Sequence, residues 1–250
     1  MLYNKYRPKT FSQVVGQEWI VRTLRNSITL DRVPHTLLFE GLRGTGKTTL
    51  ARVFATAVNC VSPVEGDPCL ECVSCQNSHK NILEVDAGSS RGVETIEDLH
   101  DTLRLRPLRG KFRTVIIDEC HMLTEAAANA ALKLFEEPPS HVVLVLCTTG
   151  QTNNPDTKVS KAFSTLASRC MRFKFAAVDI KDIYKKLRYI CKQEGQETED
   201  EVLRVIARKV RGSLRDAESL LDSAFTFSQA PVIRINDVRG LISIEEDKAL

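Results

Sequence analysis

The sequence predicts an α/β protein: a parallel sheet covered by helices on both faces, followed by a small C-terminal helical domain. Short apolar runs at 36–40, 114–118 and 142–147 have the composition of strands buried on both faces. Helical patterns alternate with these runs, which is typical of a parallel sheet. After about residue 178 only amphipathic helical patterns and one short apolar run follow.

The individual elements follow from local signals. The first strand leads through a glycine-rich turn into a helix predicted at 48–59. A second helix lies between the other two strands, where the Thr124 side chain can cap its start and Pro138 ends it. In the C-terminal part, helices are predicted at 179–194, 199–211 and 213–227, and a short strand at 232–235.

Composition narrows the class of protein. The 250 residues are 42% apolar and 27% charged, which is typical of a globular protein and excludes a disordered chain. The net charge is only +3, so any contact with nucleic acid must come from a local basic surface. The sequence has no apolar run long enough for a membrane span and no signal-peptide pattern, so we expect no membrane partner and a cytoplasmic location.

A phosphate-binding motif follows the first predicted strand. Residues 41–48 fit G-x-x-x-x-G-K-[ST] and lie between a strand and a helix, a context that makes a surface turn with a free lysine the weaker alternative. A dinucleotide fingerprint fails because Thr49 stands where its third glycine would be. Lys47 is expected to reach the β- and γ-phosphates of a nucleoside triphosphate, and Thr48 to bind Mg²⁺. The predicted nucleotide-binding residues are Gly41, Leu42, Arg43, Gly44, Thr45, Gly46, Lys47, Thr48 and Thr49.

Two carboxylates follow the second predicted strand. Asp118 is expected to hold Mg²⁺ through water, and Glu119 to orient or deprotonate the attacking water. Because this pair directly follows three apolar residues of a predicted strand, it is better explained as a site than as a solvated surface. Thr148 ends the next strand, where its side chain could sense the γ-phosphate, although this signal is weak by itself.

Four of the eight cysteines lie close together in the sequence. Cys60, Cys69, Cys72 and Cys75 supply four soft ligands, which suits a closed tetrahedral Zn²⁺ site. Free thiols, an iron–sulfur cluster, or His79 in place of Cys60 remain as alternatives. The other four cysteines lie in segments with core composition: Cys120, Cys147, Cys170 and Cys191.

Several short motifs occur in one order along almost the whole chain, and together they resemble AAA+ ATPases of the clamp-loader branch. The cysteine cluster and Glu136-Glu-Pro-Pro139 narrow the resemblance to the gamma/tau subunits of bacterial DNA polymerase III. The motifs are Arg7-Pro8, Val14-Val15-Gly16-Gln17, the phosphate loop, Asp118-Glu119, Thr148-Thr149, Ser168-Arg169-Cys170 and Gly212-Ser-Leu-Arg-Asp216.

The resemblance assigns further roles. It implies that Arg169 is an arginine finger for the ATP site of an adjacent subunit, that Arg215 is the sensor arginine of the helical lid, and that residues 3–17 close over the adenine. It also implies a RecA-like ATP-binding domain at 1–176, with the zinc-binding insertion at 60–79. A helical lid would follow at 177–240 and the start of a truncated collar at 241–250.

The expected function is that of an ATP-hydrolysing, DNA-stimulated motor subunit that opens a sliding clamp and loads it onto primed DNA. Its expected partners are the delta, delta-prime and further gamma/tau subunits, the clamp, and primed DNA. A non-hydrolysing stator subunit is the main alternative, and Asp118-Glu119-Cys120-His121 also suggests a helicase. The loop at 150–167 is longer than this family leads us to expect. Its Lys158 and Lys161 could approach DNA phosphates, but a solvated loop is the stronger interpretation.

Overall fold

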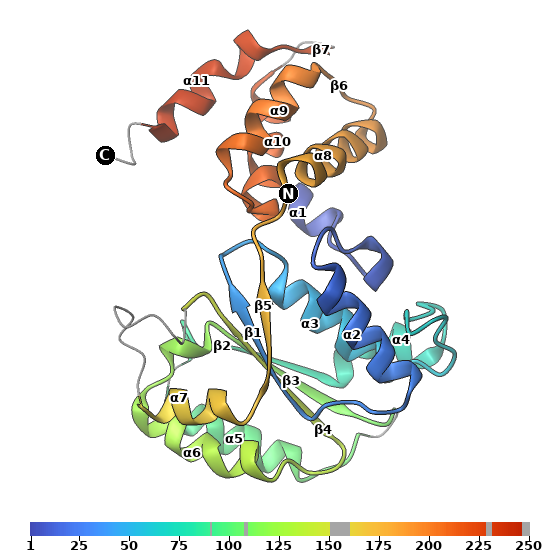
Figure 1. The fold of residues 1–250 in the computed structure, drawn as a ribbon, viewed down its shortest axis with the longest axis vertical. Helices are drawn as coiled ribbons and strands as arrows, with labels where there is room; N and C mark the ends of the chain where they lie inside the picture. Colours follow the sequence, from blue (N-terminus) through green and yellow to red (C-terminus); the bar gives the residue numbers. More distant parts are fainter. Residues whose placement is uncertain (91, 108–109, 151–160, 229–231, 247–250) are drawn as a thin grey trace.

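The computed structural model describes residues 1–250 apart from 91, 108–109, 151–160, 229–231 and 247–250 (Figure 1). A five-stranded sheet lies at the centre of the N-terminal part, with strand order β2-β3-β4-β1-β5 and every neighbouring pair parallel. This arrangement confirms the predicted fold class. The strands are β1 (Thr36–Gly41), β2 (Ile82–Asp86), β3 (Arg113–Asp118), β4 (Val142–Thr148) and β5 (Met171–Phe175).

Helices cover both faces of the sheet (Figure 1). The helices α2 (Glu18–Thr29) and α3 (Lys47–Ala57) pack on one face. The opposite face is covered by α5 (Val93–Leu103), α6 (Glu125–Glu136) and α7 (Lys161–Ser168). Short helical turns connect these elements: α1 (Leu2–Lys5), η1 (Phe11–Gln13), α4 (Val73–Gln76), η2 (Ser78–Lys80) and η3 (Cys120–Met122).

The central strand β4 shows why the sheet needs both layers. Successive side chains of a strand point to opposite faces. Leu144 and Leu146 pack in the core under α5, α6 and α7, whereas Val143 and Val145 pack in the core under α2 and α3. All seven residues of the strand are buried, which is the reason for its continuous apolar run.

The predicted strands at 36–40, 114–118 and 142–147 are confirmed as β1, β3 and β4, but β2 and β5 were not predicted. Both are edge strands of the sheet, and solvent reaches part of each. Exposed Glu84 in β2 and Arg172 and Lys174 in β5 interrupt the apolar pattern. The predicted cap of α6 is confirmed, since the Ala127 N–H donates to Thr124 Oγ1 at 3.1 Å.

A second hydrophobic core lies in the C-terminal part. The strand predicted at 232–235 is shorter in the structure. Only Val232 and Ile233 pair with another strand, and a helix begins at Ile235. The elements of this part are α8 (Ile180–Glu194), β6 (Glu197–Thr198), α9 (Asp200–Lys209), α10 (Leu214–Phe227), β7 (Val232–Ile233) and α11 (Ile235–Glu246), with β6 and β7 paired in parallel.

The N-terminal helix α1 packs with this C-terminal unit rather than with the sheet. Leu2 is buried in the C-terminal core, and the Tyr6 hydroxyl donates a hydrogen bond to Glu194 at the end of α8. The first residues therefore belong, by packing, to the second unit, which differs from the predicted domain at 1–176. In the part of the chain that the structure describes, no helix is both long enough and apolar enough to cross a membrane.

Candidate functional site

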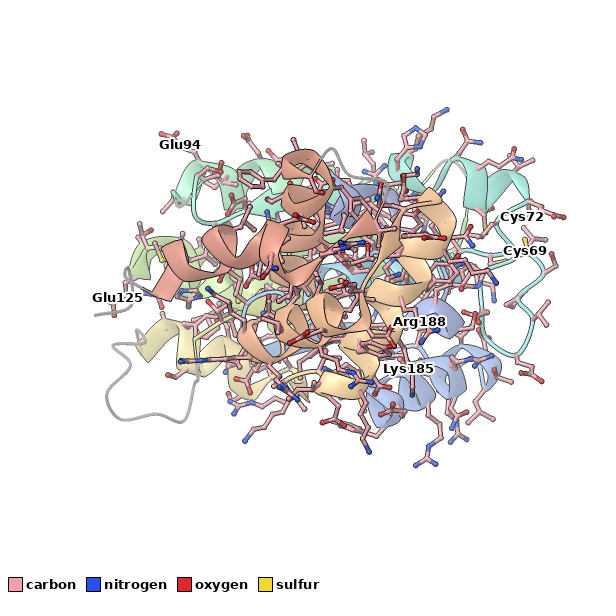
Figure 2. The ribbon with its side chains drawn as sticks, turned by 90° about the horizontal axis from the view of Figure 1, so that it is seen from above. Cys69, Cys72, Glu94, Glu125, Lys185 and Arg188 are labelled. Carbon is pink, nitrogen blue, oxygen red and sulfur yellow. The ribbon has the colours of Figure 1, made fainter. Side chains whose placement is uncertain are left out.

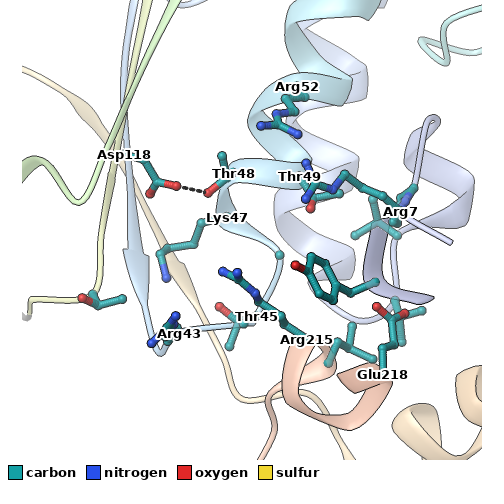
Figure 3. A pocket seen from close by; sticks show the side chains of 18 of the residues that line it. Arg7, Arg43, Thr45, Lys47, Thr48, Thr49, Arg52, Asp118, Arg215 and Glu218 are labelled. Carbon is teal, nitrogen blue, oxygen red and sulfur yellow. Dashed lines mark hydrogen bonds between the residues drawn. The ribbon is translucent and has the colours of Figure 1, made fainter. Parts of the chain in front are cut away.

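A cavity of about 690 Å³ lies between the carboxyl edge of the sheet and the helical unit (Figure 3). Its floor is the loop between β1 and α3, together with the ends of β2, β3 and β4. The N-terminal segment and the start of α10 close the other side. Ligand sites in open parallel sheets occur at this edge, outside the carboxyl ends of the strands.

The predicted phosphate loop lies in this cavity. β1 ends at Gly41 and α3 begins at Lys47, so the free N–H groups of the α3 N-terminus meet the cavity. The Lys47 ammonium group donates to the carbonyls of Gly41 and Leu42, each at 2.8 Å. Burial lowers the pKa of Lys47, and the nearby Glu119 and Asp118 carboxylates act in the opposite direction.

The two residues predicted to bind magnesium are in direct contact. Thr48 Oγ1 donates to Asp118 Oδ2 at 2.7 Å, and both residues line the cavity (Figure 3). A hydroxyl and a carboxylate oxygen are the kind of ligands that Mg²⁺ takes when it also binds phosphates. The residues present therefore fit a magnesium ion beside the phosphate loop.

Glu119 lines the cavity next to Asp118 and is held in place from behind. Its backbone has φ +47°, and its Oε2 accepts a 2.8 Å hydrogen bond from the Thr149 hydroxyl. His121 Nδ1 lies 3.5 Å from the same oxygen. This places the carboxylate where it faces the cavity, as the general base prediction requires.

Thr149, not the predicted Thr148, lines the cavity. Thr148 is fully buried, and its hydroxyl lies 3.0 Å from Nδ1 of His121. Successive residues at the end of a strand point in opposite directions, so only one of the two threonines can face the ligand. Thr149 is the second residue of the Thr148-Thr149 motif.

The helical unit contacts the phosphate loop through the first turn of α10. The Leu214 N–H donates to the Gly44 carbonyl at 3.0 Å, and Ser213 caps the helix by accepting from the Asp216 N–H at 3.3 Å. Arg215 lines the cavity and is directed from α10 toward the loop (Figure 3). Its guanidinium carbon lies 5.1 Å from the centre of the Tyr3 ring.

Arg169, the predicted arginine finger, lies outside this cavity. It precedes β5, whose first residue Met171 pairs with Leu37 near the start of β1, so Arg169 lies at the amino edge of the sheet. Its guanidinium donates to Glu136 Oε1 at 2.6 Å and to the Thr165 carbonyl at 2.8 Å. It does not line this chain's own cavity. Lys158 and the side chain of Lys161 lie outside the described residues.

The structure brings the four clustered cysteines together. One sulfur atom from each lies within 4.8 Å of all the others, and the group in the described residues contains Cys60 rather than His79. The Cys72 N–H donates to Cys69 Sγ at 3.4 Å and, with other hydrogen bonds, lowers the pKa of Cys69 to about 6. Figure 2 shows Cys69 and Cys72 at the periphery of the molecule.

This donor set fits a tetrahedral zinc ion, because four thiolates in one compact group are the ligands of closed structural sites. The remaining cysteines match the expectation of core residues. Cys120 and Cys147 are fully buried, Cys191 is buried and Cys170 is half-buried. Burial raises the pKa of all four thiols.

Some cavity residues were missed in the sequence. Asp86 ends β2 in register with Asp118, and it would have been found had β2 been predicted. Arg52, Lys186 and Glu218 lie on helices that were predicted, but nothing in the sequence indicated which side of those helices faces the ligand.

Known structures establish the fold to which this protein belongs. The Thermotoga maritima RuvB Holliday junction branch migration motor superposes with a TM-score of 0.70 at 20% identity, over 96% of this chain and 72% of that one. A structure of a single-residue variant of the same motor gives a TM-score of 0.70 at 19% identity, with the same coverage of both chains. This chain and that motor thus share a fold, which here is a parallel sheet followed by a helical unit.

Family profiles and relatives then define the family. The profile "DNA polymerase III, delta subunit" matches residues 16–179, and "DNA polymerase III clamp loader subunit, ATPase lid domain" matches 182–230. The chain therefore belongs to the family of DNA polymerase III clamp-loader subunits.

Relatives agree with this assignment. DNA polymerase III subunit tau of Bacillus subtilis is 39% identical over 97% of this chain, and subunit tau of Escherichia coli is 38% identical over 100%. Subunit gamma of Buchnera aphidicola from Schizaphis graminum is 37% identical over 92%. The chain spans 43%, 38% and 62% of the lengths of these three relatives.

Gly44→Ala is expected to weaken the contact between the loop and the lid. Gly44 has φ +77°, and an added Cβ would lie 2.0 Å from Ser213 Oγ. Gly46→Ala is the matched control, because φ is +97° but no atom lies within 4 Å of the added Cβ. Both variants carry backbone strain of about 1–3 kcal/mol.

Urea unfolding without nucleotide measures the difference. We expect Gly44→Ala to be less stable than Gly46→Ala by roughly 1–3 kcal/mol, the cost of overpacking. Equal free energies of unfolding for the two variants would show that the lid does not rest on the loop.

Proposed function

We propose that this chain is an ATP-hydrolysing motor subunit of the bacterial clamp loader, coupling ATP binding and hydrolysis to loading of a sliding clamp onto primed DNA. The main support is that Lys47, Thr48, Asp118 and Glu119 line one cavity at the carboxyl edge of the sheet. Each has the chemistry for one part of phosphoryl transfer to water.

The division of work follows from the contacts. A bound Mg²⁺, which Thr48 and Asp118 would hold, would supply positive charge beside the phosphates. The Lys47 ammonium group, now on the loop carbonyls, transfers its hydrogen bonds to phosphate oxygens. Glu119, whose carboxylate accepts a hydrogen bond from Thr149, orients the attacking water or accepts a proton from it. Arg215 adds a second positive charge from the lid side.

Arg169 serves the site of an adjacent subunit in this proposal. Its position at the amino edge of the sheet keeps it away from its own cavity, and its guanidinium is partly exposed beside Glu136. An arginine supplied by a neighbour offsets charge that develops at the γ-phosphate and accelerates hydrolysis by roughly 10³–10⁵. Hydrolysis would then require assembly.

The two alternatives account for less of the structure. A stator subunit has no need for a lysine, a hydroxyl and two carboxylates in one cavity. A helicase of the Asp-Glu-Cys-His type needs a second motor domain, and the described residues after 178 form a helical unit instead. Membership of the clamp-loader family also favours a motor subunit over a helicase.

The remaining assignments belong to the same proposal. The ATP-binding domain covers the residues before 177 apart from α1, with the zinc insertion at 60–79, and the lid covers 177–240 together with α1, which packs against it. The partners are delta, delta-prime and further gamma/tau copies, the clamp and primed DNA. ATP, Mg²⁺ and Zn²⁺ are the cofactors, and the location is the cytoplasm.

Turnover in the reconstituted clamp loader tests the motor function. We expect DNA-stimulated ATP hydrolysis to fall roughly a hundredfold or more with Lys47→Ala, since removal of one charge-stabilising donor costs this much. Arg169→Ala is expected to lose about a thousandfold yet to bind ATP normally, because the finger acts in trans. Arg188→Ala, an exposed lid arginine, is the control.

Normal turnover by the Lys47→Ala loader would contradict the proposal. Loss of ATP binding by Arg169→Ala would show that this arginine acts in its own subunit or on folding.

Metal analysis tests the cysteine site. We expect one zinc per chain, and less than half of this content in Cys72→Ser, because three thiolates leave the coordination incomplete. Cys170→Ser, outside the cluster, is the matched control and should retain the metal. Iron, or no metal, in the unaltered chain would overturn the zinc assignment.

A further inference from the structure

The predicted arginine finger lies where two helices end. α6 and α7 pack side by side (Figure 1), α6 ends at Glu136, and Arg169 directly follows Ser168, the last residue of α7. The Arg169 N–H donates to the Leu166 carbonyl at 3.0 Å, and the Arg169 carbonyl accepts a hydrogen bond from the Thr36 hydroxyl of β1 at 3.0 Å. The backbone of Arg169 is therefore fixed both to a helix and to the sheet.

Two hydrogen bonds direct the guanidinium group of Arg169. Its Nη1 donates to the Thr165 carbonyl at 2.8 Å, and its Nη2 donates to Glu136 Oε1 at 2.6 Å. Both acceptors lie in the last turn of a helix, where the helix dipole favours positive charge. The cation is thus stabilised by one carboxylate and by the carboxyl ends of two helices.

The same guanidinium group keeps donors for a phosphate. Arginine has five N–H donors, and the contacts with the described residues use two of them. The side chain is 34% exposed, so an adjacent subunit can reach the remaining donors. Arg169 can therefore bind an oxyanion while its contact with Glu136 is kept.

Glu136 itself has a rigid support. It ends α6, and the preceding residues Leu134 and Phe135 are buried in the core. The Glu137 N–H donates to the Lys133 carbonyl at 3.1 Å and closes the last turn of the helix. A side chain on a packed helix holds another group more precisely than a side chain on a loop. Glu136 does not line the cavity, so the phosphoryl-transfer residues of its own subunit do not account for it.

We propose that Glu136 is a positioning residue for ATP hydrolysis in the adjacent subunit, because its carboxylate orients the Arg169 guanidinium before that group meets the γ-phosphate. The inference rests on the proposed function, in which Arg169 acts in trans. A free arginine side chain loses rotamer entropy when it binds, whereas an oriented one has already lost it. Glu136 contacts no nucleotide in this scheme and acts only through Arg169.

DNA-stimulated turnover of the reconstituted clamp loader at saturating ATP tests the inference. We expect Glu136→Ala to lower kcat roughly fivefold, the upper end for a partly exposed ion pair. Glu136→Gln keeps an oxygen acceptor for the guanidinium and should recover most of the lost turnover. Glu137→Ala, which removes the exposed neighbouring glutamate, is the matched control and should leave kcat unchanged.

Two further measurements separate positioning from folding. The dissociation constant of Mg²⁺-ATP should be the same for Glu136→Ala and the unaltered chain, because Glu136 lies outside its own cavity. In single-turnover experiments on the Arg169→Ala loader, the additional change Glu136→Ala should have almost no effect, since the residue through which it acts is absent. A further fivefold loss there would show that Glu136 acts by another route.

Three other results would overturn the inference while leaving the motor function intact. These are equal turnover of Glu136→Ala and Glu137→Ala, a Glu136→Gln loader as slow as Glu136→Ala, and faster turnover in Glu136→Ala, which would mean that the carboxylate restrains the finger. If Arg169→Ala leaves turnover unchanged, the finger assignment in the proposed function is wrong, and the inference falls with it.

Discussion

The hydrogen bond from the Leu214 N–H to the Gly44 carbonyl fixes the helical unit over the edge of the sheet. It joins the loop that would hold phosphates to the first turn of α10. The contact depends on Gly44, since any side chain there would overlap Ser213. Arg215 and Glu218 take their places in the cavity from this one junction, so a nucleotide in the loop would contact both units of the molecule.

The parallel sheet places the cavity residues at one edge and Arg169 at the opposite edge. Every strand of a parallel sheet has its carboxyl end at the same edge, which brings Gly41, Asp118 and Thr149 to one edge from distant parts of the sequence. Arg169 lies at the opposite edge, in contact with Glu136. In a proposed assembly, one copy can then offer a complete cavity on one side and a cation for its neighbour on the other.

The fold class and the phosphate loop were predictable because their signals are local. The buried strands β1, β3 and β4 carry continuous apolar runs, and the loop motif is contiguous. The edge strands β2 and β5 were missed because solvent-exposed charged residues interrupt their patterns. Thr149 was passed over in favour of Thr148 because one step along a strand end reverses the direction of the side chain.

The position of α1 could not be predicted either. A helix of four residues is too short to show a hydrophobic periodicity, so its sequence does not indicate which core contains Leu2. Glu218 gave no signal for a related reason. A glutamate within an amphipathic helix is normally solvated, and only tertiary packing buries it here, where α10 packs against α1, α8 and α9.

A crystal structure of the chain with Mg²⁺ and a non-hydrolysable ATP analogue would test the central claim most directly, that the cavity between the loop and the lid is an ATP site. We predict that the triphosphate lies along the loop and that the Lys47 ammonium group leaves the carbonyls of Gly41 and Leu42 for phosphate oxygens. A triphosphate bound outside this cavity, or a Lys47 still held by the two carbonyls with nucleotide present, would contradict the account.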